Sequence, residues 1–172
     1  MIIFQTERLV VRRLTQDDLP GFHQLESDPD VLRYADGERK DELANATDLA
    51  KCIGHYSDPG FEFCIWALVE KVSSAFVGTC ALVRDDGGGH EIGYRLIQTE
   101  WGKGFGKEAC NGLVDYCIDA LQLSMLTAHV DSRNVASVRI LEQSRLTRLA
   151  CDSPDGCEYA ITFRWTRDGE TL

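Results

Sequence analysis

The sequence predicts a mixed α/β fold of the α+β type, with a mostly antiparallel central sheet flanked by helices. Three strand-like runs joined by short polar linkers predict the antiparallel part of the sheet. A glycine-rich turn between an apolar strand and an amphipathic helix then predicts a βαβ unit from His90 to Val130. A chain of 172 residues is long enough for one domain and short for two. We therefore expect residues 1–172 to form a single domain.

The first half of the chain reads as a strand, two helices and a three-stranded meander. Residues 8–14 combine β-branched with other residues and predict a strand, after which Thr15 can cap a helix that carries acidic residues in its first turn. Apolar residues at helical spacing predict a second helix from Lys40 to Tyr56. The three strands of the meander are expected at Phe61 to Glu70, Ala75 to Arg84 and His90 to Ile97.

The second half continues with alternating helices and strands. Apolar residues every four positions predict an amphipathic helix from Gly104 to Leu121. A strand from Ser124 to Val130 and a helix from Asn134 to Ser144 are expected next. The chain is predicted to close with two strands, within 146–152 and 157–166, around a turn at 153–156.

Composition excludes several classes of protein. A net charge of −10 is the wrong sign for binding nucleic acid through phosphates. No signal peptide or membrane-length apolar run is visible, so we expect a cytoplasmic protein without a membrane partner. Seven cysteines without C-x-x-C spacing predict buried reduced thiols, and the scattered histidines predict no metal site.

The stretch "EWGKGFGKEA" places three glycines where the predicted strand gives way to a helix. A dinucleotide-binding fingerprint would need a glycine at Lys107, and a P-loop would need a glycine at Trp101 and a hydroxyl residue at Glu108. What remains is a helix N-terminus whose free N–H groups, from Lys103 to Lys107, suit a phosphate or pyrophosphate. The alternative is a turn that binds nothing.

The stretch from Glu91 to Ala109, "EIGYRLIQTEWGKGFGKEA", resembles the acetyl-CoA-binding motif of the GNAT superfamily of N-acetyltransferases. It is most similar to the branch that contains the ribosomal-protein acetyltransferases RimJ and RimL, where the "WGKG" sequence is usual. A second block, "DSRNVASVRILEQ", resembles the N-x-x-S segment of the family, and the opening "TERLVVRRLTQDDL" resembles the first strand and helix of the branch.

The resemblance implies direct transfer of an acetyl group from acetyl-CoA, as cosubstrate, to a primary amine. It assigns the backbone of Tyr94, Leu96 and Ile97 to pantetheine and the acetyl oxygen, and Asn134 and Ser137 to the cofactor as well. The same resemblance assigns the pyrophosphate to Lys103, Gly104, Phe105, Gly106 and Lys107.

The catalytic groups are less well defined by the resemblance. It implies Glu91 as general base or water-holding residue, with Glu62 on the neighbouring strand as second choice, although either can equally be a solvated strand carboxylate. It places Ser137 near the sulfur, where the hydroxyl can instead make only a local hydrogen bond. The tyrosine that many family members use as general acid is replaced by Leu141.

A departure from the family pattern follows this helix, where "QSRL" places Arg145 and Leu146 at the positions of the usual glycine and aromatic residue. Without that glycine, we expect the helix to end in another conformation. The departure and the missing tyrosine favour a second hypothesis, a non-catalytic CoA-binding or regulatory protein. A third is an α/β domain that binds another phosphate compound.

The acceptor amine is not encoded in any motif we recognise. A protein N-terminus and small-molecule amines both suit the acidic chain. In the family, specificity comes from the region that corresponds to Asp28 to Gly60. We expect a monomer or a homodimer, with an edge strand near the C-terminus as the contact.

Overall fold

The computed structural model describes residues 1–35, 38–57, 63–85, 88–149 and 159–167. Its eight-stranded sheet has the order β1-β2-β3-β4-β5-β6-β8-β7. Every neighbouring pair is antiparallel except β5 and β6, which are parallel. The strands are β1 (Ile2–Gln5), β2 (Leu9–Arg13), β3 (Phe63–Glu70), β4 (Phe76–Arg84), β5 (His90–Leu96), β6 (Met125–Asp131), β7 (Thr147–Arg148) and β8 (Ala160–Thr166).

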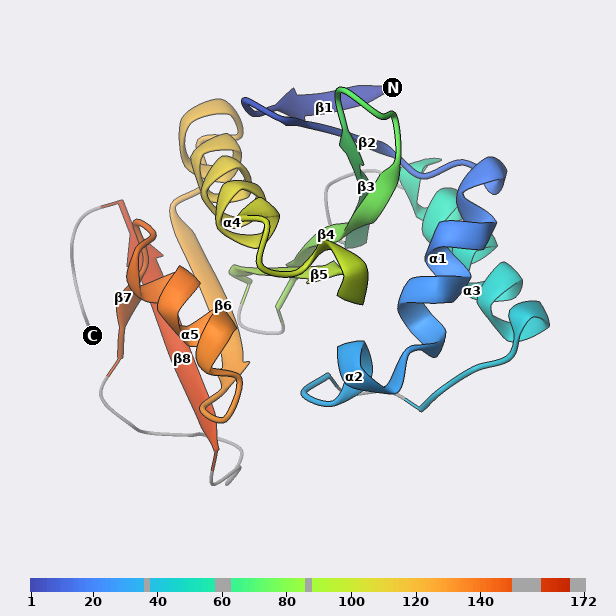
Figure 1. Cartoon of the computed structure of the whole chain (residues 1–172). Coiled ribbons are helices and arrows are strands. Elements are labelled where there is room, and N and C mark those ends of the chain that lie inside the picture. Colours follow the sequence, from blue (N-terminus) through green and yellow to red (C-terminus); the bar gives the residue numbers. More distant parts are fainter. Residues whose placement is uncertain (36–37, 58–62, 86–87, 150–158, 168–172) are drawn as a thin grey trace.

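Helices cover the sheet on both faces (Figure 1). One face carries α1 (Leu19–Ser27) and α3 (Glu42–Gly54), with the short α2 (Pro29–Leu32) between them in the chain. The opposite face carries α4 (Phe105–Asp115), which ends in a π-helical turn, η4 (Tyr116–Ala120), and α5 (Val135–Glu142). Three short 3₁₀ turns complete the order: η1 (Gln16–Asp18), η2 (His55–Ser57) and η3 (Gln98–Glu100).

Each face of the sheet has its own apolar core. The larger core packs α4 against the sheet through residues such as Leu113, Phe105 and Trp66. The smaller core packs α1 and α3 on the other face through Phe22 and Leu49. Because strand side chains alternate between the two faces, both cores depend on the period-two pattern in β3 and β4.

The structure confirms the antiparallel meander and the βαβ unit, since β3, β4 and β5 pair in sequence and β5 lies parallel to β6. The prediction missed β1, which pairs with β2 in an N-terminal hairpin. The predicted helix from Gly104 to Leu121 is wrong at its C-terminal end, because α-helical geometry stops at Asp115 and continues as the π-helical turn.

The two closing strands pair as predicted, with β7 opposite β8. The predicted turn at 153–156 lies outside the described residues. The corner after α5 also ends as expected, without a left-handed residue. Instead, the Ser144 hydroxyl donates to the Leu141 carbonyl at 2.7 Å and accepts from the Leu146 amide at 3.1 Å, which closes the last turn.

The cysteines that the structure describes are free and buried, as predicted. Burial raises the pKa of Cys110 to about 12 and that of Cys52 to about 11, so these thiols are protonated near neutral pH. Cys151 and Cys157 lie outside the described residues. Among the described helices, none combines the length and the apolar character needed to cross a membrane.

Candidate functional site

The central opening of the sheet lies between the two parallel strands. β5 pairs with β4 along its whole length, whereas its register with β6 is limited to Glu91 opposite Thr127. The Thr127 hydroxyl donates to the His90 carbonyl at 3.3 Å at the same level. Toward their carboxyl ends, where α4 and α5 begin, the strands are no longer paired. Parallel strands that separate in this way leave backbone groups accessible to a ligand.

The loop before α4 has the backbone conformation that its glycines suggest. Gly102 and Gly104 have φ values of 73° and 86°, in the left-handed region that favours glycine. No side chain caps the start of α4. The amide N–H groups from Lys103 to Lys107 also have no acceptor among the described residues. The first turn of α4 therefore presents unpaired donors at the positive end of the helix dipole.

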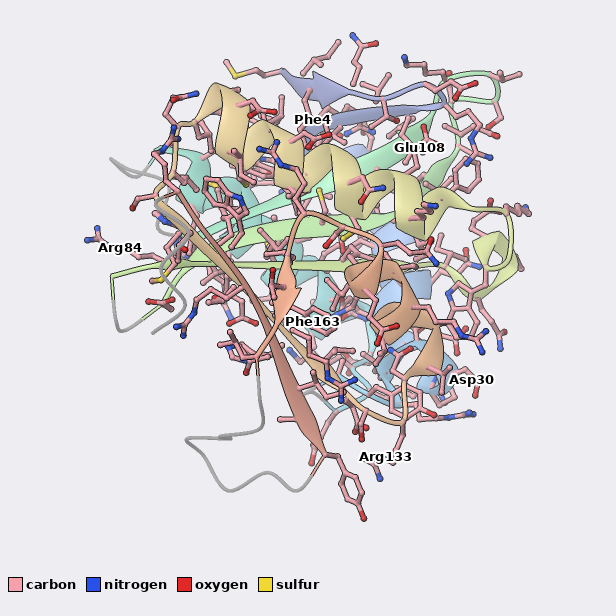
Figure 2. All side chains as sticks on the ribbon, turned by 90° about the vertical axis from the view of Figure 1, so that its left-hand side faces the viewer. Phe4, Asp30, Arg84, Glu108, Arg133 and Phe163 are labelled. Carbon is pink, nitrogen blue, oxygen red and sulfur yellow. The ribbon has the colours of Figure 1, made fainter. Side chains whose placement is uncertain are left out.

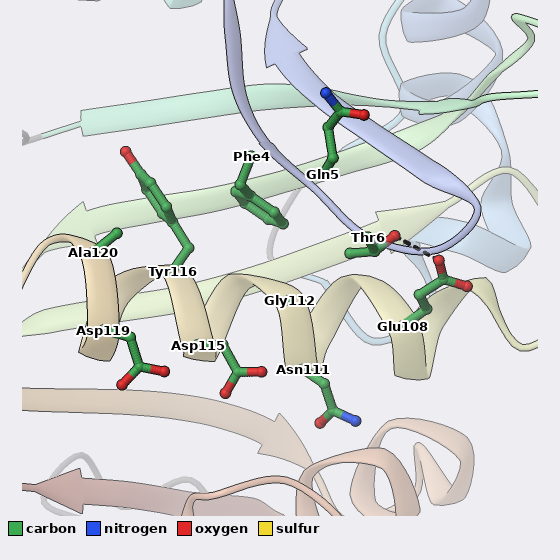
Figure 3. Close-up of a pocket in the computed structure, with 10 residues that line it drawn as sticks. All are labelled: Phe4, Gln5, Thr6, Glu108, Asn111, Gly112, Asp115, Tyr116, Asp119 and Ala120. Carbon is green, nitrogen blue, oxygen red and sulfur yellow. Dashed lines mark hydrogen bonds between the residues drawn. The ribbon is translucent and has the colours of Figure 1, made fainter.

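A polar clamp from the N-terminal hairpin braces this loop. Arg8 donates from Nε to Glu108 at 2.7 Å and from Nη1 to the Lys103 carbonyl at 2.9 Å. Glu108 also accepts from the Arg8 amide. It accepts as well from the Thr6 hydroxyl, a bond that Figure 3 shows. The Arg8 guanidinium lies 4.6 Å from the centre of the Phe105 ring. Burial raises the pKa of Glu108, but the hydrogen bonds from Thr6 and Arg8 outweigh it and lower the pKa overall.

Sequence reasoning missed the clamp, because its two ends are 100 residues apart. Figure 2 shows Glu108 in the first turn of α4 beside the β1–β2 hairpin. The only local signal was an acidic residue in the first turn of a helix, which is common and does not identify a partner.

Charged and aromatic side chains border the loop before α4. Lys103 forms an ion pair with Glu100 at 3.0 Å, and the exposed Lys107 has no ion pair among the described residues. Trp101 is 46% exposed, and its indole N–H donates to the Leu96 carbonyl at 2.9 Å. This indole therefore ties the loop to the end of β5.

Ile97 is an expected cofactor residue whose backbone N–H and carbonyl are both hydrogen-bonded within the protein. Its N–H donates to the Val77 carbonyl at 3.0 Å, and its carbonyl accepts from the Glu100 amide at 2.9 Å. The side chain is also buried. These two bonds join Ile97 to the β4 edge and to η3, and the expectation that its backbone contacts pantetheine stays a prediction.

The start of α5 differs from that of α4. The Asn134 side chain accepts from the Ser137 amide at 3.2 Å and so caps the helix. Just before it, Arg133 forms an ion pair with Asp131, and Figure 2 shows Arg133 at the far end of β6. The cap fixes the first turn of α5 and holds Ser137 half-buried on the α4 side of the sheet.

α4, α5 and β5 meet at Gly106. A Cβ atom at Gly106 would lie 3.1 Å from Ile140 Cδ1, 3.5 Å from Leu96 Cδ1 and 3.6 Å from Tyr94 Cε2. The tyrosine ring therefore packs against the first turn of α4. Tyr94 Oη is buried at this junction.

The catalytic candidates do not form one cluster. Glu91 is half-buried at the level where β5 and β6 separate. Ile92 and Leu96 belong to the core under α4, so strand alternation directs Glu91 to the opposite face of the sheet from Ser137. Glu62 lies outside the described residues.

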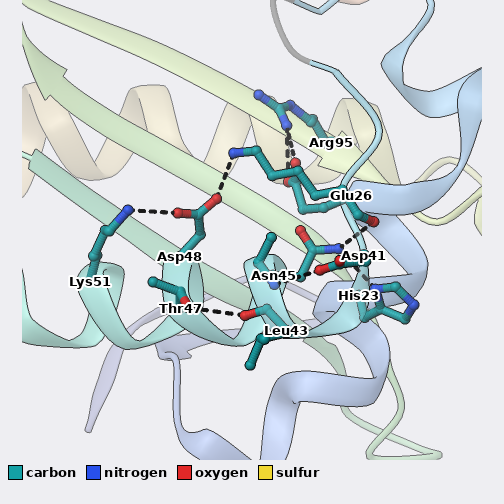
Figure 4. Close-up of polar contacts among 11 residues, drawn as sticks. His23, Glu26, Asp41, Leu43, Asn45, Thr47, Asp48, Lys51 and Arg95 are labelled. Atoms are coloured by element: carbon teal, nitrogen blue, oxygen red, sulfur yellow. Dashed lines mark hydrogen bonds and ion pairs between the residues drawn. The ribbon is translucent and has the colours of Figure 1, made fainter.

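The face toward which Glu91 points carries a polar network that joins α1, α3 and β5 (Figure 4). Arg95, two residues beyond Gly93 on the same face, contacts both carboxylate oxygens of Glu26 at 2.9 and 2.8 Å. Lys40 pairs with Asp48. These contacts fix the helices that border this side of the strand opening.

A separate open groove of about 670 Å³ runs between β1 and α4 (Figure 3). Its lining includes Phe4, Asn111 and Tyr116, and it touches the clamp at Glu108. The acidic residues Asp115 and Asp119 at its other end pair with Arg145. The groove lies along the β1 side of α4 and not at the opening between β5 and β6.

The comparisons with known proteins agree with this geometry. The family model for the acetyltransferase (GNAT) domain matches residues 8–147. The chain belongs to the GNAT acetyltransferases. It is therefore an acyltransferase of the N-acetyltransferase class. Its relatives include an uncharacterized N-acetyltransferase, p20, from Bacillus licheniformis, 32% identical over 138 residues that cover 79% of this chain and 77% of p20.

Solved structures share the fold at low identity. RimL, the ribosomal L7/L12 α-N-protein acetyltransferase solved with coenzyme A, has a TM-score of 0.81 and 14% identity, covering 99% of this chain and 100% of RimL. Spermidine N-acetyltransferase from Vibrio cholerae, solved with CoA and spermine, has a TM-score of 0.77 and 18% identity, covering 94% and 96% of the two chains. The GNAT fold of this chain is thus a mixed sheet flanked by helices.

Proposed function

We propose that residues 1–172 form one cytoplasmic N-acetyltransferase domain that moves an acetyl group from acetyl-CoA to a primary amine. The single observation that carries this proposal is the uncapped start of α4, with its free amides at the opening between β5 and β6. Those donors fit a pyrophosphate in charge and in shape. The low-identity structures that contain CoA support acetyl-CoA as the cosubstrate.

The loop and the elements next to it would contact different parts of acetyl-CoA. The amides of Lys103, Gly104, Phe105, Gly106 and Lys107 would bind the pyrophosphate, with the ammonium group of Lys107 beside them. Bound acetyl-CoA would supply a thioester with a leaving thiolate. Tyr94 and Leu96 border the opening and would line pantetheine, while Asn134 holds the first turn of α5, on which Ser137 faces the α4 side.

Glu91 would act on the amine from the opposite face. A lysine side chain with a pKa near 10.4 needs about 4 to 5 kcal/mol for deprotonation at pH 7, whereas an α-amino group with a pKa near 8 needs only about 1 kcal/mol. A base is therefore decisive for a lysine-like amine and nearly dispensable for an α-amine. We propose a protein N-terminal α-amine or a small-molecule amine as the acceptor, and a monomer or homodimer as the functional form.

Thermal melting with acetyl-CoA, CoA, NAD and ATP side by side tests the cosubstrate. A ligand at about a hundred times its Kd stabilises the fold by about 2.7 kcal/mol. Each kcal/mol raises the melting temperature of a chain of this size by roughly 2 to 4 °C. We expect the two CoA compounds to raise the melting temperature and NAD and ATP to leave it unchanged. Equal shifts with all four would favour a general phosphate-binding domain.

Single substitutions test the catalytic assignments and the non-catalytic alternative. We expect Glu91→Gln to slow acetylation of a lysine-like amine more than that of an α-amine, measured by thiol release, because only the former needs the base. Ser137→Ala should lower the rate for both amines. If wild-type protein binds acetyl-CoA but accepts no amine, the regulatory hypothesis is the better one.

A further inference from the structure

Arg164 on β8 is a half-buried cation that the described residues leave without a charged partner. Its Nε atom is buried and makes no hydrogen bond to any of them. The chain has 28 acidic residues against 18 lysines and arginines, so carboxylates that could pair with it are abundant. A partly buried charge without a partner destabilises a fold, and it is retained most readily where a ligand supplies the opposite charge.

Strand register places Arg164 in one row with Glu91. Thr127 of β6 lies opposite Glu91 on one side and opposite Arg164 on the other. Ile161 and Phe163 of β8 belong to the core under α4, so strand alternation directs Arg164 to the other face of the sheet, toward which Glu91 also points. Neighbouring strands lie about 4.8 Å apart, which separates the Cα atoms of Glu91 and Arg164 by about 10 Å.

The face that carries this row has open space beside it. Gly93, the next residue of β5 on the same face, has nothing within 4 Å of the place where a Cβ atom would lie. One pair of neighbouring polar side chains is already satisfied, since His129 Nδ1 lies 3.1 Å from Thr162 Oγ1. Glu91 and Arg164 therefore border open space as an anion and a cation that form no ion pair with the described residues.

An acceptor that carries both an amine and a carboxylate would complement these two groups. In an α-amino acid, the nitrogen and the carboxylate carbon are about 2.5 Å apart. With a hydrogen bond of about 2.9 Å at each end, such a molecule fits between Glu91 and Arg164. The arginine fork matches the two oxygens of a carboxylate, whereas a polyamine would bring a second cation beside it.

We propose that Arg164 selects a free α-amino acid as the acceptor, by binding its α-carboxylate while Glu91 holds its amino group. This inference rests on the proposed function and narrows its acceptor to one class of small-molecule amine. Arg164 contributes to binding and not to the chemical step, because the carboxylate keeps its charge throughout the transfer. A peptide N-terminus has a neutral carbonyl at the same place and would leave the arginine without its counter-charge.

The test compares each standard α-amino acid with its own α-carboxamide as acceptor, measured by thiol release at saturating acetyl-CoA. In wild-type protein, we expect at least one amino acid to have a KM at least about tenfold below that of its carboxamide, because the amide loses the charge-assisted hydrogen bonds. Spermidine and a peptide that begins with the same residue should be poorer acceptors. Similar KM values for acid and carboxamide, or better transfer to spermidine or the peptide, would overturn the inference and leave the proposed function intact. This comparison requires no variant to fold.

Substitution of the arginine is the second arm of the test. Arg164→Gln should raise the KM for the amino acid by about tenfold to a hundredfold, with little change in kcat and none in the KM for the carboxamide. Arg164→Lys keeps the charge without the fork and should recover part of the loss. Arg148→Gln is the matched control, because this exposed arginine of β7 lies opposite Phe163 and pairs with Glu142.

Two further outcomes separate the inference from the proposed function. Equal losses for acid and carboxamide in Arg164→Gln would assign the residue a packing role and overturn the inference. Wild-type protein that binds acetyl-CoA but accepts no amine would overturn the proposed function itself, and the inference with it.

Discussion

Helices α4 and α5 both begin at the carboxyl end of neighbouring parallel strands, but their first turns are satisfied differently. α5 is capped by its own Asn134, which accepts from the Ser137 amide. α4 has no side-chain cap, and its loop is braced from outside by Arg8 and Glu108, which leave the amide donors free. One helix start thus satisfies its own first turn, whereas the other leaves its amides unpaired, and we propose the unpaired start as the anion site.

The largest effect is expected where the uncapped start depends on a left-handed glycine. Gly104→Ala would place a Cβ 3.2 Å from Arg8 Nη2 at a φ of 86°. A left-handed residue with a side chain costs about 1 to 2 kcal/mol, so we expect the affinity for CoA to fall by about tenfold. Gly54→Ala, where a Cβ would meet nothing within 4 Å, is the control. Calorimetry measures the CoA affinity of both variants. An unchanged affinity in Gly104→Ala would contradict the contrast between the two helix starts.

The external brace should contribute to stability through its charge. We expect Glu108→Gln to lower the free energy of unfolding at pH 7 by about 1 to 3 kcal/mol. The lower half of that range is expected, because Arg8 is 42% exposed and water screens the ion pair. Denaturant unfolding of Glu108→Gln and of Glu7→Gln, an exposed residue of the same hairpin, measures the difference.

The same carboxylate predicts a pH dependence. The pKa of Glu108 is lowered in the folded protein, so its contribution is complete above the unfolded value of about 4.3 and is lost as pH falls through the folded pKa. The difference in stability between wild-type protein and Glu108→Gln should therefore shrink below about pH 4. A difference that stayed constant down to pH 3 would show that the charge of Glu108 is not what braces the loop.

The self-capped helix should show the smallest effect. Asn134→Ala removes the acceptor of the Ser137 amide and should destabilise the fold by about 0.5 to 2 kcal/mol. Asn134→Asp keeps an acceptor and should restore most of that loss. The change in CoA affinity should be smaller than for Gly104→Ala. If Asn134→Ala weakened CoA binding more than Gly104→Ala, the assignment of ligand site and scaffold would have to be exchanged.

Local signals in the sequence were enough to predict both helix starts. The glycine-rich turn marks the start of α4 at Gly104, where the structure has a left-handed φ, and the predicted start of α5 at Asn134 is the residue that caps it. The Arg8–Glu108 clamp could not be predicted, since nothing local relates two residues 100 positions apart.

Two other features required the packed structure. Strand alternation can place Tyr94 on the α4 face, but only the packing of three elements shows that its ring lies against the first turn of α4. The short β1 strand has a weak signal of its own, and its strand pairing with β2 depends on the tight turn in which the Thr6 amide donates to the Leu9 carbonyl.

The most direct test of the contrast between the two helix starts is an NMR titration of ¹⁵N-labelled protein with CoA. A new hydrogen bond to phosphate moves an amide proton downfield, so the largest downfield shifts should appear among the amides from Lys103 to Lys107. The Ser137 amide, already bonded to Asn134, should keep its hydrogen bond and move little. Binding of CoA with the loop amides unmoved, or with the largest downfield shift at the start of α5, would contradict the account.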